Sequence, residues 1–222
     1  MKTYVIFDLD GTLLNTIDDL ANATNHALQA HGYPQHGMWV YPTMVGNGVG
    51  KLIERALPED ARSEANIKAV LNSFKSYYSE HCCELTKPYP GIPELLEELT
   101  ALGVNLAVTS NKYQEAVTNI ISHYFPNDNF KAILGNEDGI PRKPDPSIVF
   151  KALSMCPTPK SDVLYVGDSG VDMETARRAC VESVGVSWGF RTIHELKEAY
   201  ADHIISTPSQ ILDLLGRESA PA

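Results

Sequence analysis

Two aspartates stand two positions apart near the start of the chain, in Asp8-Leu9-Asp10-Gly11-Thr12. They follow the apolar run Tyr4–Phe7, which predicts a strand buried on both faces. Side chains at positions i and i+2 of an extended chain share a face, so both carboxylates can point into one pocket. Carboxylates held this close repel each other unless a proton or a cation offsets their charge, and Mg²⁺ takes oxygen ligands of this kind.

This pair of carboxylates suits the transfer of a phosphoryl group. One carboxylate can attack phosphorus and form an aspartyl-phosphate. A second acid beside it can protonate the leaving oxygen and later deprotonate the hydrolytic water. The alternative is a loop in which aspartate only caps the next helix. The position directly after a buried strand, with Gly-Thr following, favours the catalytic interpretation.

Three further polar segments stand beside predicted strands or helices. Thr109-Ser110-Asn111-Lys112 offers a hydroxyl and a backbone amide at a predicted helix N-terminus, which is a phosphate cradle. The prolines around Lys143 predict a rigid turn that holds its ammonium near a phosphate. Asp168, with Asp172 four residues on, adds carboxylates for the metal. Each segment alone is explained by helix capping or a solvated lysine; their joint occurrence predicts one site.

The elements that would position these residues alternate between strand and helix, which predicts a doubly wound α/β fold with a mainly parallel, Rossmann-like sheet. Ligands bind such sheets beyond the carboxyl ends of the strands. The predicted strands are short apolar runs: Tyr4–Phe7, Leu106–Thr109, Ala132–Leu134, Val163–Val166, Val184–Val186 and His203–Ile205. The helices with the strongest signals between them are Ile92–Leu102, Asp172–Cys180 and Ser209–Leu215.

One stretch interrupts this alternation with helical patterns alone, namely Ile17–His31, Val49–Leu57 and Ile67–Ser79. It predicts an all-helical cap domain over residues 15–87, inserted into an α/β core domain of residues 1–14 and 88–222. The two hinges would be Leu14–Thr16 and Tyr89–Gly91. Residues 217–222 are expected to form a frayed tail.

Composition restricts the possible partners. The chain carries 28 acidic against 18 basic residues, a formal charge of −10, and no basic cluster, which argues against nucleic-acid binding. No apolar run is long enough to cross a membrane, and no secretory signal is recognised, so a cytoplasmic protein without membrane contact is expected. The four cysteines show neither zinc spacing nor a disulfide framework. We expect a monomer or a weak homodimer.

The segments around Asp8, Ser110, Lys143 and Asp168 resemble, in this order, the four motifs of the haloacid dehalogenase superfamily, and the insert resembles its C1-type cap. The resemblance covers essentially the whole chain. It implies that Asp8 is the nucleophile and a Mg²⁺ ligand. Asp10 would be the general acid and base and would give the metal its backbone carbonyl.

The same resemblance implies the other roles. Asp168 would be a third protein ligand of the metal, and Asp172 would support the metal through water or hydrogen bonds. Ser110 and the Asn111 amide would bind the phosphoryl oxygens, with Thr109 as a competitor for the place of Ser110. Lys143 would neutralise charge. A carbon–halogen hydrolase needs no acid at Asp10, whereas a phosphatase does, so phosphoryl transfer is favoured.

The substrate is expected to be a small phosphate ester. Val45-Gly46-Asn47-Gly48 and Val186-Ser187-Trp188-Gly189 resemble segments of phosphoglycolate phosphatases. Open amides at Gly46, Asn47 and Gly48, with Lys51 or Arg55, could meet a small anion or carboxylate; a plain glycine turn is the alternative. Hydrolysis of 2-phosphoglycolate is the first hypothesis. The alternatives are a β-phosphoglucomutase-like mutase, a broad sugar-phosphate phosphatase, a pyrophosphatase and a non-catalytic phosphate-binding protein.

Overall fold

The computed structural model describes residues 1–126, 130–137 and 139–216, and the predicted frayed tail lies outside them. Six parallel strands form one sheet in the order β5-β4-β1-β6-β7-β8. The predicted α/β fold with a mainly parallel sheet is therefore confirmed. Its strands are β1 Tyr4–Phe7, β4 Asn105–Tyr113, β5 Phe130–Asn136, β6 Val163–Gly167, β7 Glu182–Val186 and β8 His203–Ile205.

Helices cover both faces of this sheet, which explains why its central strands lack polar alternation. All four residues of β1 have no exposed surface. One face packs against apolar residues of α5, α6 and α10, and the other against α7 and α8. The bounds are α5 Ile92–Ala101, α6 Gln114–Tyr124, α7 Ser147–Met155, α8 Gly170–Ala179, α9 Ile193–Glu198 and α10 Gln210–Asp213. A 3₁₀ turn, Lys160–Asp162, precedes β6.

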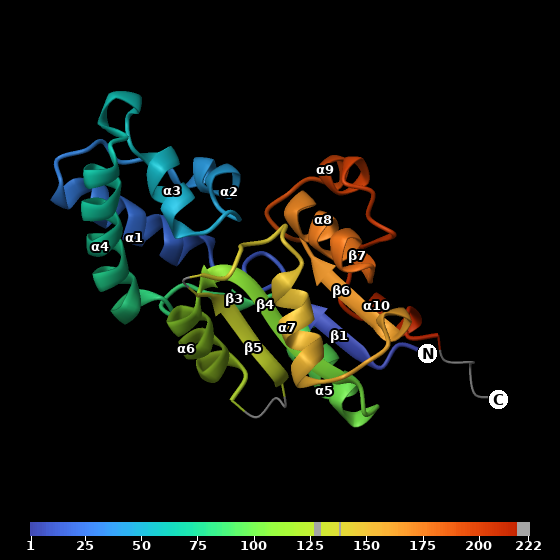
Figure 1. Ribbon diagram of the computed structural model, residues 1–222. Coiled ribbons are helices and arrows are strands. Elements are labelled where there is room, and N and C mark those ends of the chain that lie inside the picture. Colours follow the sequence, from blue (N-terminus) through green and yellow to red (C-terminus); the bar gives the residue numbers. More distant parts are fainter. Residues whose placement is uncertain (127–129, 138, 217–222) are drawn as a thin grey trace.

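Four helices lie together beyond the ends toward which the central strands point (Figure 1). We refer to them as the cap helices: α1 Ile17–Ala30, α2 Tyr41–Met44, α3 Val49–Ala56 and α4 Glu64–His81, with 3₁₀ turns at Met38–Val40 and Glu59–Ala61. The chain enters and leaves this group through an antiparallel pair, β2 Leu14–Asn15 and β3 Lys87–Pro88. Division into two domains at these points remains a prediction. No helix in the described part of the chain is long and apolar enough to cross a membrane.

Asp19, in the first turn of α1, binds the chain as it leaves the cap helices. Its buried carboxylate accepts hydrogen bonds from the backbone amides of Leu85 and Thr86 and from the Thr86 hydroxyl, at 2.7–3.1 Å. Hydrogen bonds to a buried charged acceptor are stronger than those between neutral groups. The start of α1 and the return segment are therefore fixed to each other beside β2 and β3.

One local expectation from the sequence is wrong. Ser110, Asn111 and Lys112 do not stand at a helix N-terminus but continue β4 to Tyr113. Tyr113 pairs with Asn136 of β5 beyond a register shift, and this pairing holds the chain extended. Helix α6 begins only at Gln114.

Candidate active site

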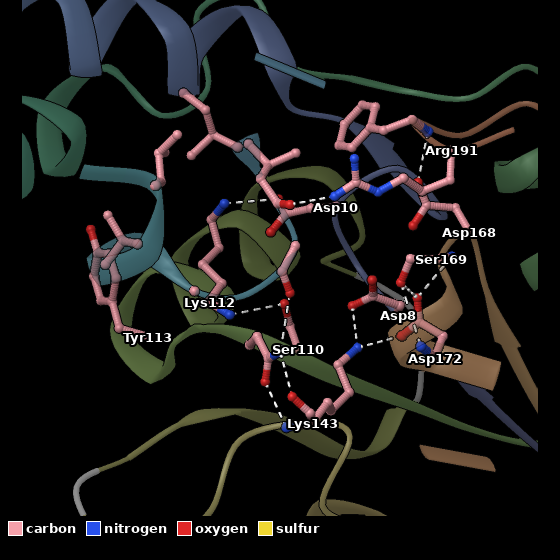
Figure 2. Close-up of a pocket in the computed structure, with 18 of the residues that line it drawn as sticks. Asp8, Asp10, Ser110, Lys112, Tyr113, Lys143, Asp168, Ser169, Asp172 and Arg191 are labelled. Atoms are coloured by element: carbon pink, nitrogen blue, oxygen red, sulfur yellow. Dashed lines mark hydrogen bonds and ion pairs between the residues drawn. The ribbon is translucent and has the colours of Figure 1, made fainter. Parts of the chain in front are cut away.

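Three buried carboxylates meet at the carboxyl ends of two adjacent strands. Asp8 follows β1, Asp168 follows β6, and Asp172 lies in the first turn of α8. One oxygen from each lies within 4.8 Å of the other two. The residues are only 8%, 3% and 1% exposed, respectively. The sequence predicted this convergence, and Figure 2 shows it.

Hydrogen bonds from neighbouring loops fix two of these carboxylates. The Phe190 amide donates to Asp168 Oδ2 at 2.6 Å. The Ser169 hydroxyl donates to Asp172 Oδ2 at 2.6 Å, in addition to the two backbone hydrogen bonds of the capping box that begins α8. The loop after β7 packs tightly here, because a Cβ on Gly189 would overlap the Asp168 side chain and the Gly11 carbonyl.

Lys143 is the cation inside this group. Its ammonium lies 2.9 Å from Asp8 Oδ1 and 2.7 Å from Asp172 Oδ1, and it donates to the Thr109 carbonyl at 3.2 Å. Asn111 holds the backbone of Lys143 from both sides, since its side chain accepts from the Lys143 amide and donates to the Lys143 carbonyl. The sequence predicted a fixed ammonium here but not that Asn111 would fix it.

Burial and mutual repulsion disfavour negative charge in this cluster. Burial, and then the Asp172 carboxylate, raise the pKa of Asp8 to about 7, although Lys143 opposes the shift. Burial, Asp172 and Asp8 raise the pKa of Asp168 well above its ordinary range. Burial lowers the pKa of Lys143, but Asp172 and Asp8 more than offset this and raise it well above its usual value. One ammonium does not balance three carboxylates.

The cluster has the donors that Mg²⁺ requires. Carboxylate oxygens are hard ligands, and a divalent cation would replace the protons that the raised pKa values otherwise favour. Asp8 and Asp168 would hold the ion, with Asp172 beside them. This set of donors fits the predicted metal.

Asp10 turns away from the other carboxylates. Its Oδ1 accepts from the Thr16 hydroxyl at 2.7 Å and pairs with the Lys112 ammonium at 2.8 Å. Lys112 is 6% exposed and extends from β4 into the pocket. Lys112 was not among the site residues predicted from the sequence, although it stands next to Asn111 in a segment already singled out.

Ser110, and not Thr109, faces the pocket. The Thr109 hydroxyl is fully buried and hydrogen-bonded to Tyr165 at 2.9 Å. Ser110 lines the pocket, and its hydroxyl accepts from the Lys112 amide at 3.2 Å. The geometry thus favours Ser110 of the two candidates for phosphoryl contact.

The loop between α2 and α3, Val45–Gly48, which we call the cap loop, brings only some of the predicted substrate contacts to the pocket. Gly46 and Gly48 line it. The Asn47 side chain instead accepts from Arg55 at 2.8 Å, outside the pocket lining. Lys51 is exposed and pairs with Glu54 at 2.6 Å, so its predicted contact with substrate is not present in this arrangement.

Arg191 connects the core to this cap loop and was not selected from the sequence. It follows the Trp188-Gly189 segment and lines the pocket. Its guanidinium donates to the carbonyls of Pro42 and Val45 at 2.6 and 2.7 Å. Asn111 adds a third link, to the Gly46 carbonyl at 3.1 Å.

The resulting pocket has a charged floor and an apolar roof. The floor carries four aspartates, Asp8, Asp10, Asp168 and Asp172, facing Lys112 and Lys143. The cap helices and their loop contribute mostly apolar side chains, namely Leu20, Val45, Val49, Leu52, Phe74 and Tyr78. Such a roof excludes water from a reaction at the floor and strengthens electrostatic interactions there.

Comparison with known proteins places this architecture among phosphatases. The family model of haloacid dehalogenase-like hydrolases matches residues 5–186. The phosphoglycolate phosphatase of Aquifex aeolicus is 32% identical over 211 residues, which are 95% of each chain. A solved candidate phosphoglycolate phosphatase from Lactobacillus delbrueckii is 33% identical, with a TM-score of 0.90 over 98% of this chain and 100% of that one. A predicted phosphoglycolate phosphatase from Haemophilus somnus is 30% identical, with a TM-score of 0.89 over 96% and 97%.

Proposed function

The chain belongs to the haloacid dehalogenase-like hydrolase family and is a phosphatase, and we propose a substrate and a metal for it. It hydrolyses 2-phosphoglycolate or a similar small phosphate monoester with Mg²⁺ bound. The observation that carries the proposal is the contact of Lys143 with both Asp8 and Asp172, beside Asp168. This arrangement can receive a phosphoryl group and compensate its charge. The similarity to proteins named phosphoglycolate phosphatases supports this substrate.

In the proposed reaction, Asp8 attacks phosphorus and the bond to the ester oxygen breaks. Protonated Asp10 gives its proton to the departing oxygen, which leaves as the alcohol. Asp10 then takes a proton from water as that water attacks the aspartyl-phosphate, and Asp8 and inorganic phosphate are released. Ser110 and the amide of Asn111 hold the phosphoryl oxygens. Lys143 keeps Asp8 oriented and offsets the charge that accumulates in the transition state.

Mg²⁺ bound by Asp8 and Asp168 would supply positive charge to the transferring oxygens. Without it, a phosphate dianion would have to approach three buried carboxylates. The Asp10 carbonyl is the further metal ligand that we propose, with Asp172 supporting the site.

The proposal is tested by phosphate release from a panel of esters with Mg²⁺: 2-phosphoglycolate, sugar phosphates, pyrophosphate and glucose 1-phosphate. Asp8→Asn should abolish turnover, whereas Asp60→Asn, an exposed carboxylate on the cap, should not change it. A chelator should also abolish turnover. Equal and negligible release by the wild type and Asp8→Asn on every ester would contradict a hydrolase. Isomerisation of glucose 1-phosphate without phosphate release would identify a mutase instead.

A further inference from the structure

Lys112 places a buried positive charge where the core meets the cap helices. Its ammonium pairs with Asp10 at 2.8 Å and lies 4.9 Å from the centre of the Tyr78 ring of α4. The side chain is only 5% exposed. In Figure 2 it extends into the pocket from β4, on the opposite side of Ser110 from Lys143. Nothing in the proposed chemistry so far uses this ammonium.

The cations of the pocket differ in what holds them. Lys143 is held by Asp8, Asp172 and the Thr109 carbonyl, so it keeps the Asp172 carboxylate as a partner when Asp8 reacts. Arg191 is held by the carbonyls of Pro42 and Val45 and lies 3.7 Å from the Glu195 carboxylate. Among the described residues that line the pocket, Lys112 is the cation that pairs with a single carboxylate, and that carboxylate must itself react.

The reaction would leave Lys112 without its negative partner. To deliver its proton, the Asp10 side chain must face the ester oxygen. A side chain turned toward that oxygen no longer makes the 2.8 Å pair with Lys112. A buried ammonium without an anion is costly, so the site is most favourable for a substrate that supplies a replacement.

We propose that Lys112 binds a second anionic group of the substrate, a carboxylate on the carbon next to the phosphate ester oxygen. This deepens the proposed function and rests on it, since Lys112 would select phosphorylated hydroxy acids over neutral alkyl phosphates. The Asp10 carboxyl group pairs with Lys112 and must also reach the ester oxygen to protonate it, so the ester oxygen binds close to the Lys112 ammonium. A carboxylate one carbon from that oxygen therefore lies within reach of the same ammonium.

The surroundings strengthen this selection. Leu20, Phe74 and Tyr78 line the pocket with apolar surface. A carboxylate that enters such a pocket loses water and must regain the lost interactions from the protein. Charge-assisted hydrogen bonds to an ammonium do this, whereas an uncharged substituent gains nothing from Lys112.

A role confined to positioning Asp10 makes a different prediction. Loss of Lys112 would then slow proton transfer to every leaving group by a similar factor. Under our proposal, the loss falls mainly on the substrate that carries the carboxylate. The ratio of two substrates in one enzyme preparation separates these roles and does not depend on how much of the variant is correctly folded.

The test compares 2-phosphoglycolate with ethyl phosphate in the Mg²⁺-loaded wild type, Lys112→Met and Lys112→Arg. We expect the preference of kcat/KM for 2-phosphoglycolate to fall by about 10–100-fold in Lys112→Met, the value of a charge-assisted hydrogen bond, and to survive largely in Lys112→Arg. Calorimetric binding in the Asp8→Asn background should show the same selective loss of affinity, without any dependence on proton transfer.

The outcomes separate the two proposals. A wild-type preference that Lys112→Met retains overturns the role of Lys112 and leaves the proposed substrate standing. A wild type that hydrolyses both esters equally well overturns the proposed substrate, and the carboxylate site with it. An equal loss on both substrates in Lys112→Met, with unchanged binding in the Asp8→Asn background, assigns Lys112 to positioning Asp10 alone.

Discussion

The Lys143 ammonium lies between two buried carboxylates, those of Asp8 and Asp172, which would otherwise repel each other. Its ammonium contacts Asp8 and Asp172 at 2.9 and 2.7 Å, and its side chain is 2% exposed. Removing one partner from a buried ionic group leaves the others uncompensated, which costs far more than the pair contributes when intact. Lys143 therefore matters for folding as well as for turnover.

Lys143→Met should lower the free energy of unfolding of the metal-free protein by about 3–5 kcal/mol at pH 8. It should also reduce phosphatase activity by at least about 100-fold, the scale seen when one stabilising donor is lost from a transition state. Urea unfolding and phosphate release measure the two effects. Lys151→Met is the matched control, because Lys151 forms an exposed pair with Glu137. Equal stability of the two variants would contradict this assignment.

The raised pKa of Asp8 makes the metal-free protein less stable as pH rises. The folded protein holds a proton on Asp8 up to about pH 7, whereas the unfolded chain releases it near 3.8. Between these values the folded state binds more protons, so the free energy of unfolding falls with increasing pH. The carboxylate of Asp168, whose pKa is also raised, acts in the same direction.

Thermal unfolding with a chelator present should therefore show higher stability at pH 6 than at pH 8, and Asp8→Asn should reduce the difference. At 1.36 kcal/mol per pKa unit, Asp8 contributes up to about 4 kcal/mol between pH 3.8 and pH 7, of which about 1.4 kcal/mol is lost between pH 6 and pH 8. Added Mg²⁺ should stabilise the protein most at pH 8, where it does not compete with protons. Stability that rises from pH 6 to pH 8 in the chelated protein would contradict this.

The loop after β7 sets the position of Asp168, the proposed metal ligand that follows β6. The Phe190 amide donates to Asp168, and Gly189 packs where no side chain fits. Neighbouring groups that orient a ligand commonly change metal affinity by about 10–100-fold. The loop thus contributes to the site without supplying a ligand to it.

Gly189→Ala should weaken Mg²⁺ binding by at least about 10-fold, because its Cβ would push Asp168 out of place. Isothermal titration with Mg²⁺ measures this directly. Gly50→Ala in α3 is the control, since a Cβ there meets no atom within 4 Å. Unchanged Mg²⁺ affinity in Gly189→Ala would show that the loop can adjust.

The strand-end segments show what the sequence could reveal. Apolar runs located all six sheet strands, and the convergence of Asp8, Asp168 and Lys143 followed from the parallel order. The extension of β4 to Tyr113 could not be predicted, because it depends on pairing with Asn136 of a distant strand. Lys112 was overlooked for the same reason: its burial comes from Asp10 and from Tyr78 of the cap, and local sequence shows neither contact.

A few hydrogen bonds hold the cap helices over the sheet. Arg191 donates to the carbonyls of Pro42 in α2 and of Val45, and Asn111 donates to the carbonyl of Gly46. Motion of such lids admits substrate and excludes water in many enzymes. We therefore expect these contacts to stabilise the arrangement in which the cap helices cover the pocket.

Arg191→Met should populate an open arrangement, visible as a larger radius of gyration in small-angle X-ray scattering of the substrate-free protein. We also expect kcat/KM to fall by about 10-fold, since substrate would have to supply the closing energy itself. Arg177→Met, which removes an exposed pair with Glu174 on α8, should change neither quantity. Identical scattering of Arg191→Met and the wild type would show that the hydrogen bonds of Arg191 do not hold the cap helices over the pocket.

The β2–β3 pair has a consequence for how this chain could be rebuilt. Asn15 lies opposite Lys87 in an antiparallel register, so everything between them is topologically the loop of a hairpin. A two-residue Asn-Gly turn closes such a ribbon without altering its twist. The two connections between the cap helices and the parallel sheet thus already lie side by side. Replacing the cap helices by a shorter or different segment would therefore leave the order and connections of the sheet strands unchanged, together with the carboxylates at their ends.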